Sequence, residues 1–133
     1  MASIEIISGR CRVLETFINF AMIMIKLILL EGARSFLKRL SPQVMKKILY
    51  NIDRVIGGEI NAELFKKLEG SEIWEFRTLY NGTCYRLFAF WDSRKGTFVV
   101  ATHGIVKKTQ RTPRKEISRA EAIMKEYLRD RNI

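Results

Sequence analysis

The dipeptide Asn81-Gly82 constrains the fold more than any other feature of this chain. Asn-Gly favours a two-residue hairpin turn, because both residues adopt positive φ readily. The flanking segments, 73–80 and 84–91, are rich in the aromatic and β-branched residues that are typical of strands. The sequence therefore predicts an antiparallel β-hairpin in the C-terminal half of the chain.

The two-residue turn fixes which residues of this hairpin face each other. Tyr80 pairs with Thr83, and counting back places Arg77 directly opposite Arg86, on the same face of the sheet. That face also carries Glu75, Leu79 and Phe88. The opposite face carries the predicted core residues Trp74, Phe76, Tyr85, Leu87 and Ala89.

Two arginines in directly opposed positions destabilise a sheet unless something offsets their repulsion. One interpretation is that Glu75, on the same face, and water compensate the two charges. The other is that guanidinium groups placed side by side bind a phosphate, whose oxygens they can chelate. The sequence leaves both interpretations open.

The segment before the hairpin predicts one strand followed by two helices. Residues 25–30 are typical of a buried strand, and apolar residues between Ala33 and Leu40 recur at helical spacing. Ser41-Pro42 has the N-cap and first-turn residues of a new helix, which the glycine pair Gly57-Gly58 ends. Residues 59–72 are expected to form a connector with a short turn at 63–68.

A third strand at 97–103 follows a turn at 92–96, and an amphipathic helix begins at Thr112-Pro113. The predicted fold class is α+β. It consists of a small antiparallel sheet, an N-terminal helical hairpin and a C-terminal helix. Residues 1–21 are predicted to be an N-terminal extension, with a strand at 4–7 and a short helix at 13–20, and residues 22–133 the domain. Met22 and Met24 are candidates for an alternative translation start, which would make the residues before them an extension.

The chain is strongly basic, with 24 Lys and Arg against 14 Asp and Glu. Such an excess favours a polyanionic partner. Between Gly104 and Lys115 there is no acidic residue; the cations are Lys107, Lys108, Arg111, Arg114 and Lys115. A charge run of this kind is also typical of a solvated face, so the run alone leaves RNA binding and simple solvation open.

Residues that commonly hold metals or disulfides are sparse. His103 is the only histidine, and Cys11 and Cys84 lie far apart in the sequence. This pattern predicts no metal site, no cofactor and reduced thiols in a cytoplasmic protein. The apolar stretch 17–30 is interrupted by Asn19 and Lys26, so no membrane span is expected. His103 is a candidate proton-transfer residue or a structural hydrogen bonder.

Four motifs together resemble the phage-derived HigB-like branch of the RelE/ParE toxin superfamily. These motifs are Leu64–Gly70, Ile73–Arg77, Tyr85–Phe88 and His103–Pro113. The resemblance covers about residues 24–128. It implies a RelE-like fold and the toxin of a type II toxin–antitoxin pair. The implied activity is that of a ribosome-associated endoribonuclease that cleaves mRNA, and the implied partner is an antitoxin with a helix-turn-helix.

The resemblance also suggests residue roles. Arg86 matches a family arginine at the scissile phosphate, and Arg77, Lys107 and Lys108 fall where the family carries basic residues. We therefore assign catalysis to Arg77, Arg86, Lys107 and Lys108, with His103 in reserve. RNA binding is assigned to Lys66, Lys67, Arg111, Arg114 and Lys115. The family's C-terminal tyrosine is not transferred, since Tyr127 lies within the last helix.

Two other functions remain open at this stage. A ParE-like gyrase inhibitor has the same fold but acts by binding protein. A non-catalytic module would bind nucleic acid with a strong salt dependence and no cleavage.

Overall fold

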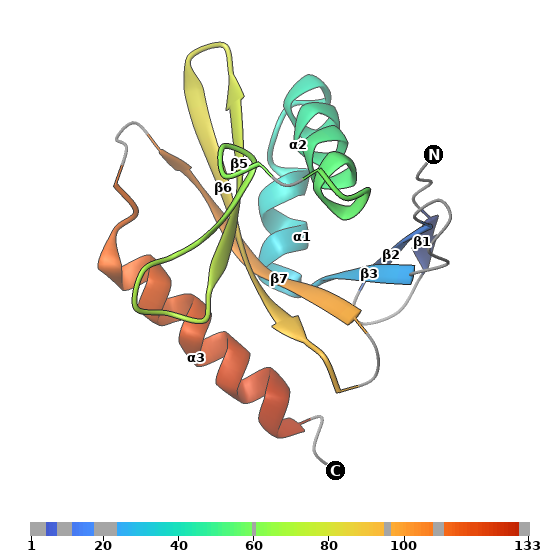
Figure 1. Ribbon diagram of the computed structural model, residues 1–133. Coiled ribbons are helices and arrows are strands. Elements are labelled where there is room, and N and C mark those ends of the chain that lie inside the picture. Colours follow the sequence, from blue (N-terminus) through green and yellow to red (C-terminus); the bar gives the residue numbers. More distant parts are fainter. Residues whose placement is uncertain are drawn as a thin grey trace.

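The computed structural model describes residues 5–7, 12–17, 24–59, 61–94, 97–107 and 111–130. Within these ranges, three helices accompany one mixed sheet in the strand order β1-β2-β3-β7-β6-β5-β4 (Figure 1). The predicted α+β class is confirmed. The strands are β1 (Glu5–Ile7), β2 (Arg12–Phe17), β3 (Met24–Leu29), β4 (Phe65–Lys67), β5 (Trp74–Tyr80), β6 (Thr83–Asp92) and β7 (Thr97–Lys107). The helices are α1 (Glu31–Lys38), α2 (Pro42–Ile56) and α3 (Arg114–Asp130).

The hairpin of β5 and β6 has the register that the Asn81-Gly82 turn predicts. Tyr80 pairs with Thr83, and Arg77 pairs with Arg86. Both turn residues have positive φ, 49° at Asn81 and 76° at Gly82. The two-residue turn therefore places both arginines on one face of the sheet.

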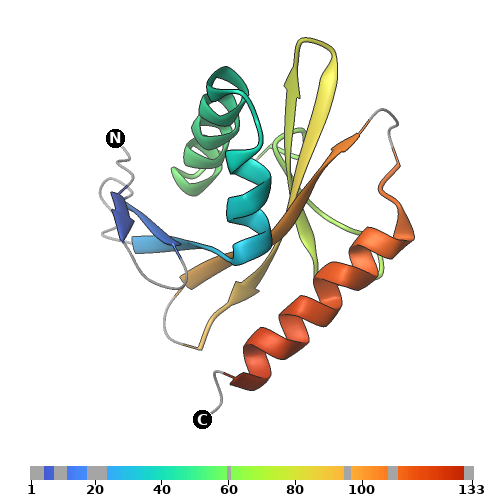
Figure 2. The same cartoon turned by 180° about the vertical axis from the view of Figure 1, so that it is seen from behind.

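Helices α1 and α2 cover the opposite face (Figure 2). The Ser41 side chain accepts a hydrogen bond from the Val44 N–H and so caps α2, as its sequence predicts. The core between these two helices and the sheet includes Phe36, Ile48, Ile52, Phe76, Leu87 and Ala89. Phe36 of α1 lies so close to Gly104 of β7 that a Cβ there would come within 2.3 Å of the ring. Glycine is therefore needed where α1 crosses β7.

Helix α3 packs on the face that carries the arginines, but lower along the strands (Figures 1 and 2). Ile117 and Ala120 of α3 pack with Ile73, Phe88 and Phe90 of the sheet. This second apolar cluster means that the sheet is buried on both faces. The arginine end of that face is left for polar side chains.

The sheet departs from the antiparallel prediction because β3 runs parallel to β7. Only strands joined by a tight turn must be antiparallel, and the helical hairpin and the β5–β6 hairpin separate β3 from β7 in the chain. Lys26 pairs with Phe98 and Leu29 with Ala101 in this parallel ladder. A strand order with one central parallel pair is therefore compatible with the predicted elements.

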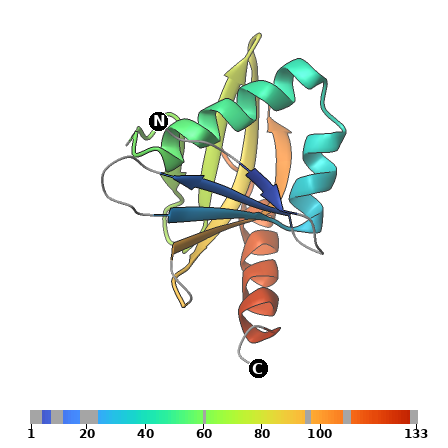
Figure 3. The same cartoon turned by 90° about the vertical axis from the view of Figure 1, so that its right-hand side faces the viewer.

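Two further predictions of secondary structure were wrong. The segment predicted as a helix at 13–20 overlaps strand β2, which covers residues 12–17 and pairs with β1 and β3 at the sheet edge (Figure 3). Backbone pairing with β3 overrides the helical spacing there. The turn predicted at 63–68 contains strand β4, a short edge strand. Its sequence, with Lys66 and Lys67, lacks the run of apolar residues from which a strand is usually predicted.

None of the helices that the structure describes is long and apolar enough to span a bilayer.

Candidate functional site

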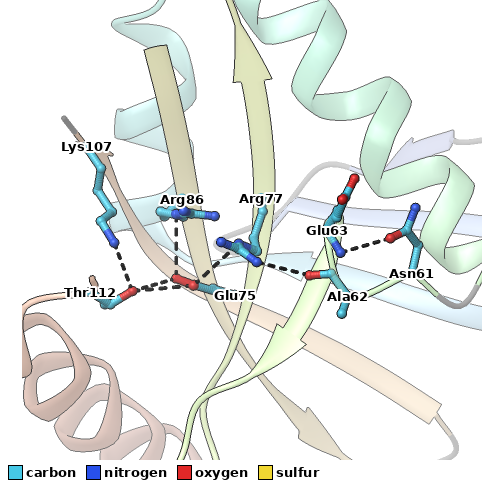
Figure 4. Close-up of polar contacts among 8 residues, drawn as sticks. All are labelled: Asn61, Ala62, Glu63, Glu75, Arg77, Arg86, Lys107 and Thr112. Atoms are coloured by element: carbon cyan, nitrogen blue, oxygen red, sulfur yellow. Dashed lines mark hydrogen bonds and ion pairs between the residues drawn. The ribbon is translucent and has the colours of Figure 1, made fainter. Parts of the chain in front are cut away.

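Arg77 and Arg86 lie side by side at the upper end of one sheet face, with Glu75 between them (Figure 4). Arg77 Nε is 3.8 Å from Oε1 of Glu75, and Arg86 Nε is 4.0 Å from Oε2 of the same carboxylate. The expected compensation by Glu75 is therefore present. One carboxylate is shared by two guanidinium groups, so it leaves positive charge at the site.

A third cation joins this group through Thr112, which precedes α3. Lys107 Nζ donates a hydrogen bond to Thr112 Oγ1 at 3.3 Å, and Thr112 Oγ1 donates to Glu75 Oε2 at 3.0 Å (Figure 4). We call Glu75, Arg77, Arg86, Lys107 and Thr112 the cationic cluster. Its members come from β5, β6, β7 and the segment before α3, and they carry three positive charges against one negative charge.

Most of the cationic cluster is withdrawn from water. Arg86 and Glu75 are each 3 % exposed and Lys107 is 4 % exposed. Burial lowers the pKa of Arg86, and the nearby charge of Arg77 lowers it further while Glu75 opposes the shift. Burial also lowers the pKa of Lys107, as do Arg86 and Arg77. The fold thus destabilises the charged forms of two side chains that the cluster brings together.

The Arg77 side chain is the more accessible of the two arginines. Its Nη1 donates to the Ala62 carbonyl at 3.2 Å, and its side chain is 22 % exposed. Among the residues that the structure describes, the Nε atoms of Arg77 and Arg86 have no hydrogen-bond acceptor. Two buried donors without an acceptor are suited to receive the oxygens of a bound anion.

Two grooves meet at Arg77. The first, of about 620 Å³, runs between β4, the cationic cluster and the start of α3. Its cations are Lys66, Arg77, Arg111 and Arg114. The second, of about 390 Å³, runs between α2 and the edge of β5 and includes both Arg77 and Arg86. A flexible polyanion that follows either groove reaches the cluster.

His103 lies on the same sheet face but makes its contacts elsewhere. Its Nε2 is 3.2 Å from Oε1 of Glu116 in α3, and its Nδ1 is 3.0 Å from Oγ1 of Thr102. The ring packs against Phe88 and is 2 % exposed. Burial lowers its pKa, Glu116 opposes that shift, and Arg119 adds to it. These contacts fit the structural alternative, in which His103 joins β7 to α3.

The other predicted site residues are distributed around the cluster. Lys66, Arg111 and Arg114 line the larger groove with Arg77. Lys67 instead forms an ion pair with Glu72, 3.8 Å away, beside the middle of α3. Lys115 is exposed on α3 and lines neither groove. Lys108 lies outside the described residues.

Thr112 and Glu116 were not among the predicted site residues. The sequence motif that ends at Thr112-Pro113 indicates a helix start, which is a sufficient reason for a threonine there. Only the packing of the segment before α3 against β5 shows that its hydroxyl reaches Glu75. No group of three or more His, Cys, Asp or Glu side chains in the described part of the chain is arranged to hold a metal ion.

The fold and site together define a small α+β domain with a buried cationic cluster on one sheet face. The chain belongs to the family of phage-derived Gp49-like proteins (DUF891), whose model matches residues 35–125. The match runs from the second half of α1 to the middle of α3 and includes every member of the cationic cluster. None of the curated proteins matches the chain.

Proposed function

We propose that this protein is an endoribonuclease that cleaves mRNA, and that it is the toxin of a type II toxin–antitoxin pair. The observation that carries the proposal is the cationic cluster, in which Arg77, Arg86 and Lys107 surround one carboxylate where two grooves meet. Membership of the phage-derived Gp49-like family and the resemblance to HigB-like toxins support the same class of function.

The proposed reaction uses the ribose 2′-hydroxyl as nucleophile. The 2′-oxygen forms a bond to the adjacent phosphorus, the bond from phosphorus to the 5′-oxygen breaks, and a 2′,3′-cyclic phosphate is left. A base takes the proton of the 2′-hydroxyl, and the 5′-oxygen that leaves gains a proton. Negative charge grows on the phosphoryl oxygens in between, so donors held in place there lower the barrier.

Arg77 and Arg86 are the proposed donors to the phosphoryl oxygens. Their guanidinium groups lie on one face in opposed register, on either side of Glu75, which accepts a hydrogen bond from Thr112. A cation that is already buried needs little reorganisation when the transition state forms. A bound phosphate also supplies negative charge next to the buried guanidinium of Arg86, which shares its one carboxylate partner with Arg77.

Lys107 is the proposed proton-transfer residue. Its lowered pKa increases the fraction of neutral amine at a given pH, and only the neutral amine accepts a proton. The contact with Thr112 places its Nζ on the side of Glu75 nearest α3. His103 stays a reserve candidate, although its contacts with Glu116 and Thr102 occupy both ring nitrogens.

Induced expression tests the function in cells. Wild type is expected to stop growth and fragment mRNA, whereas Arg86→Ala and Arg77→Ala are expected to allow growth with intact mRNA. A loss of translation before any loss of DNA synthesis separates the nuclease from a gyrase inhibitor. Arrest by wild type with intact mRNA contradicts the proposed cleavage. Co-expression of the adjacent gene product is expected to prevent arrest if that product is the antitoxin.

A further inference from the structure

Helix α2 extends the cationic cluster along the smaller groove. Lys47, Asn51 and Arg54 of α2 form one wall of this groove, and Arg77 and Arg86 lie in the other. The Asn51 side chain points at the sheet and donates to Thr78 Oγ1 at 3.2 Å. This buried contact fixes the rotation of α2 about its axis, so the Lys47 and Arg54 side of the helix faces the groove.

The exposed ring of Tyr50 lies next to Lys47 and Arg54, two of the residues that line this groove. Tyr50 lies three residues after Lys47 and four before Arg54, so the three side chains share one side of the helix. Lys47 Nζ is 5.3 Å from the centre of the tyrosine ring, and the Arg54 guanidinium carbon is 5.8 Å from it. The residue is 59 % exposed, which makes it one of the most exposed large apolar residues that the structure describes.

The two cations of α2 that line the groove, Lys47 and Arg54, differ in whether a carboxylate neutralises them. Arg54 Nε donates to Glu59 at 3.0 Å, so its main partner is a carboxylate. Lys47, by contrast, has no carboxylate partner among the residues that the structure describes. The groove also contains the acidic residue Glu63. Lys47 is therefore the α2 cation best placed to receive a phosphate, while Arg54 supports the tyrosine ring.

We infer that Lys47 and Tyr50 form a second RNA subsite, which binds the nucleotides next to the cleaved phosphate. In this α2 subsite Lys47 contacts a backbone phosphate and Tyr50 stacks on a base. Stacking on an aromatic ring accepts any base, so the subsite contributes affinity without sequence preference. The inference rests on the proposed function, because it extends an RNA path that begins at Arg77 and Arg86.

Fluorescence anisotropy with a single-stranded decanucleotide that lacks 2′-hydroxyls tests the subsite, since this oligomer binds but is not cleaved. Tyr50→Ala is expected to weaken binding roughly tenfold, the usual effect of losing one stacked base. Tyr50→Phe, which keeps the ring, is expected to bind like wild type. Lys47→Ala is expected to reduce the slope of log affinity against log salt by about 0.7, whereas Lys125→Ala on α3 leaves it unchanged.

Single-turnover cleavage of the matching RNA separates this inference from the proposed function. At subsaturating protein, Tyr50→Ala is expected to cleave more slowly than wild type, in proportion to its weaker binding, because the ring holds the RNA without touching the reacting atoms. Cleavage by wild type with unchanged affinity in Tyr50→Ala and Lys47→Ala overturns the α2 subsite alone. Binding that depends on Tyr50 and Lys47 without any cleavage supports the subsite and contradicts the nuclease. Equal loss in Tyr50→Phe and Tyr50→Ala overturns the stacking role.

Discussion

Arg86 Nε lies 4.0 Å from Oε2 of Glu75, and this carboxylate is shared with Arg77, whose Nε is 3.8 Å from Oε1. A buried and a half-buried arginine that share one buried carboxylate are a costly arrangement for a small domain. Burial lowers the pKa of Arg86, which means that its charged form is less favourable in the fold than in water. Its charge therefore opposes folding, which is typical of side chains retained for function.

Replacing Arg86 by an apolar side chain of similar length is predicted to abolish cleavage with little change in stability. Arg86→Met removes a buried charge and its repulsion with Arg77, while the buried carboxylate of Glu75 keeps Arg77 and Thr112 as partners, so the free energy of unfolding is expected to stay within about 1 kcal/mol of the wild-type value. Urea denaturation and an RNA cleavage assay measure the two quantities. A less stable Arg86→Met protein that still cleaves RNA contradicts the account.

Arg94 provides the matched control for this substitution. It contacts the carboxylate of Asp92, which is 3 % exposed, at 3.0 Å, and this contact raises the pKa of Arg94. Arg94→Met leaves that buried carboxylate with one partner fewer, so it is expected to lower stability while RNA cleavage persists. Different stability effects of the same substitution at two arginines distinguish a functional charge from a structural one.

Thr112 is predicted to be a positioning residue for Lys107 and Glu75. Thr112→Val keeps the shape but removes the hydroxyl, and is expected to cost about 1 to 2 kcal/mol of stability because buried partners lose a hydrogen bond. The rate of cleavage is expected to fall while the affinity for an uncleavable oligomer stays within about twofold. Thr112→Ser, which restores the hydroxyl, should recover most of the rate. Equal cleavage rates for Thr112→Val and Thr112→Ser would contradict a positioning role of the hydroxyl.

Lys107 is predicted to set the acidic limb of the pH–rate profile. Its neutral amine is the active form, so kcat/KM is expected to rise with pH until the lowered pKa of Lys107 is passed. Lys107→Arg keeps the charge but cannot lose its proton in this range, and it is expected to lose that limb along with most of the rate. If the pH–rate profile of Lys107→Arg is identical to that of wild type, a group other than Lys107 transfers the proton.

His103 is predicted to make the fold sensitive to mild acid. Burial lowers its pKa in the folded state, so between that pKa and the unfolded value of 6.5 the unfolded chain binds more protons. Stability is therefore lost as pH falls from about 6.5 through the folded pKa. Urea denaturation at several pH values should show a smaller loss for His103→Gln than for wild type, by at most about 1.4 kcal/mol per pH unit. If the free energy of unfolding changes equally with pH in wild type and in His103→Gln, His103 is not the group responsible for the acid sensitivity.

The hairpin register shows how much of the site the sequence predicts. Asn81-Gly82 is a local signal that fixes the pairing of Arg77 with Arg86, and the structure has that pairing. Ser41-Pro42 likewise predicts the start of α2 from adjacent residues alone. Signals of this kind need no knowledge of the rest of the fold.

The features that were not predicted from the sequence depend on contacts between segments that are far apart in the chain. Thr112 reaches Glu75 across 37 residues, and no local pattern indicates that distance. Strand β2 forms because β3 offers it a pairing edge, although the spacing of its apolar residues favours a helix. The parallel pairing of β3 with β7 depends on the path of the whole chain between them. Tertiary packing decides each of these cases.

The central claim is that Arg77 and Arg86 promote attack by a 2′-hydroxyl on the neighbouring phosphate. The most direct test incubates purified wild type and Arg77→Gln with an end-labelled single-stranded RNA and with the same oligomer lacking 2′-hydroxyls. We expect RNA fragments that end in a 2′,3′-cyclic phosphate, no cleavage of the second oligomer, and a rate reduced at least about 100-fold in Arg77→Gln. Cleavage of both oligomers, or equal rates for the folded variant and wild type, would contradict it.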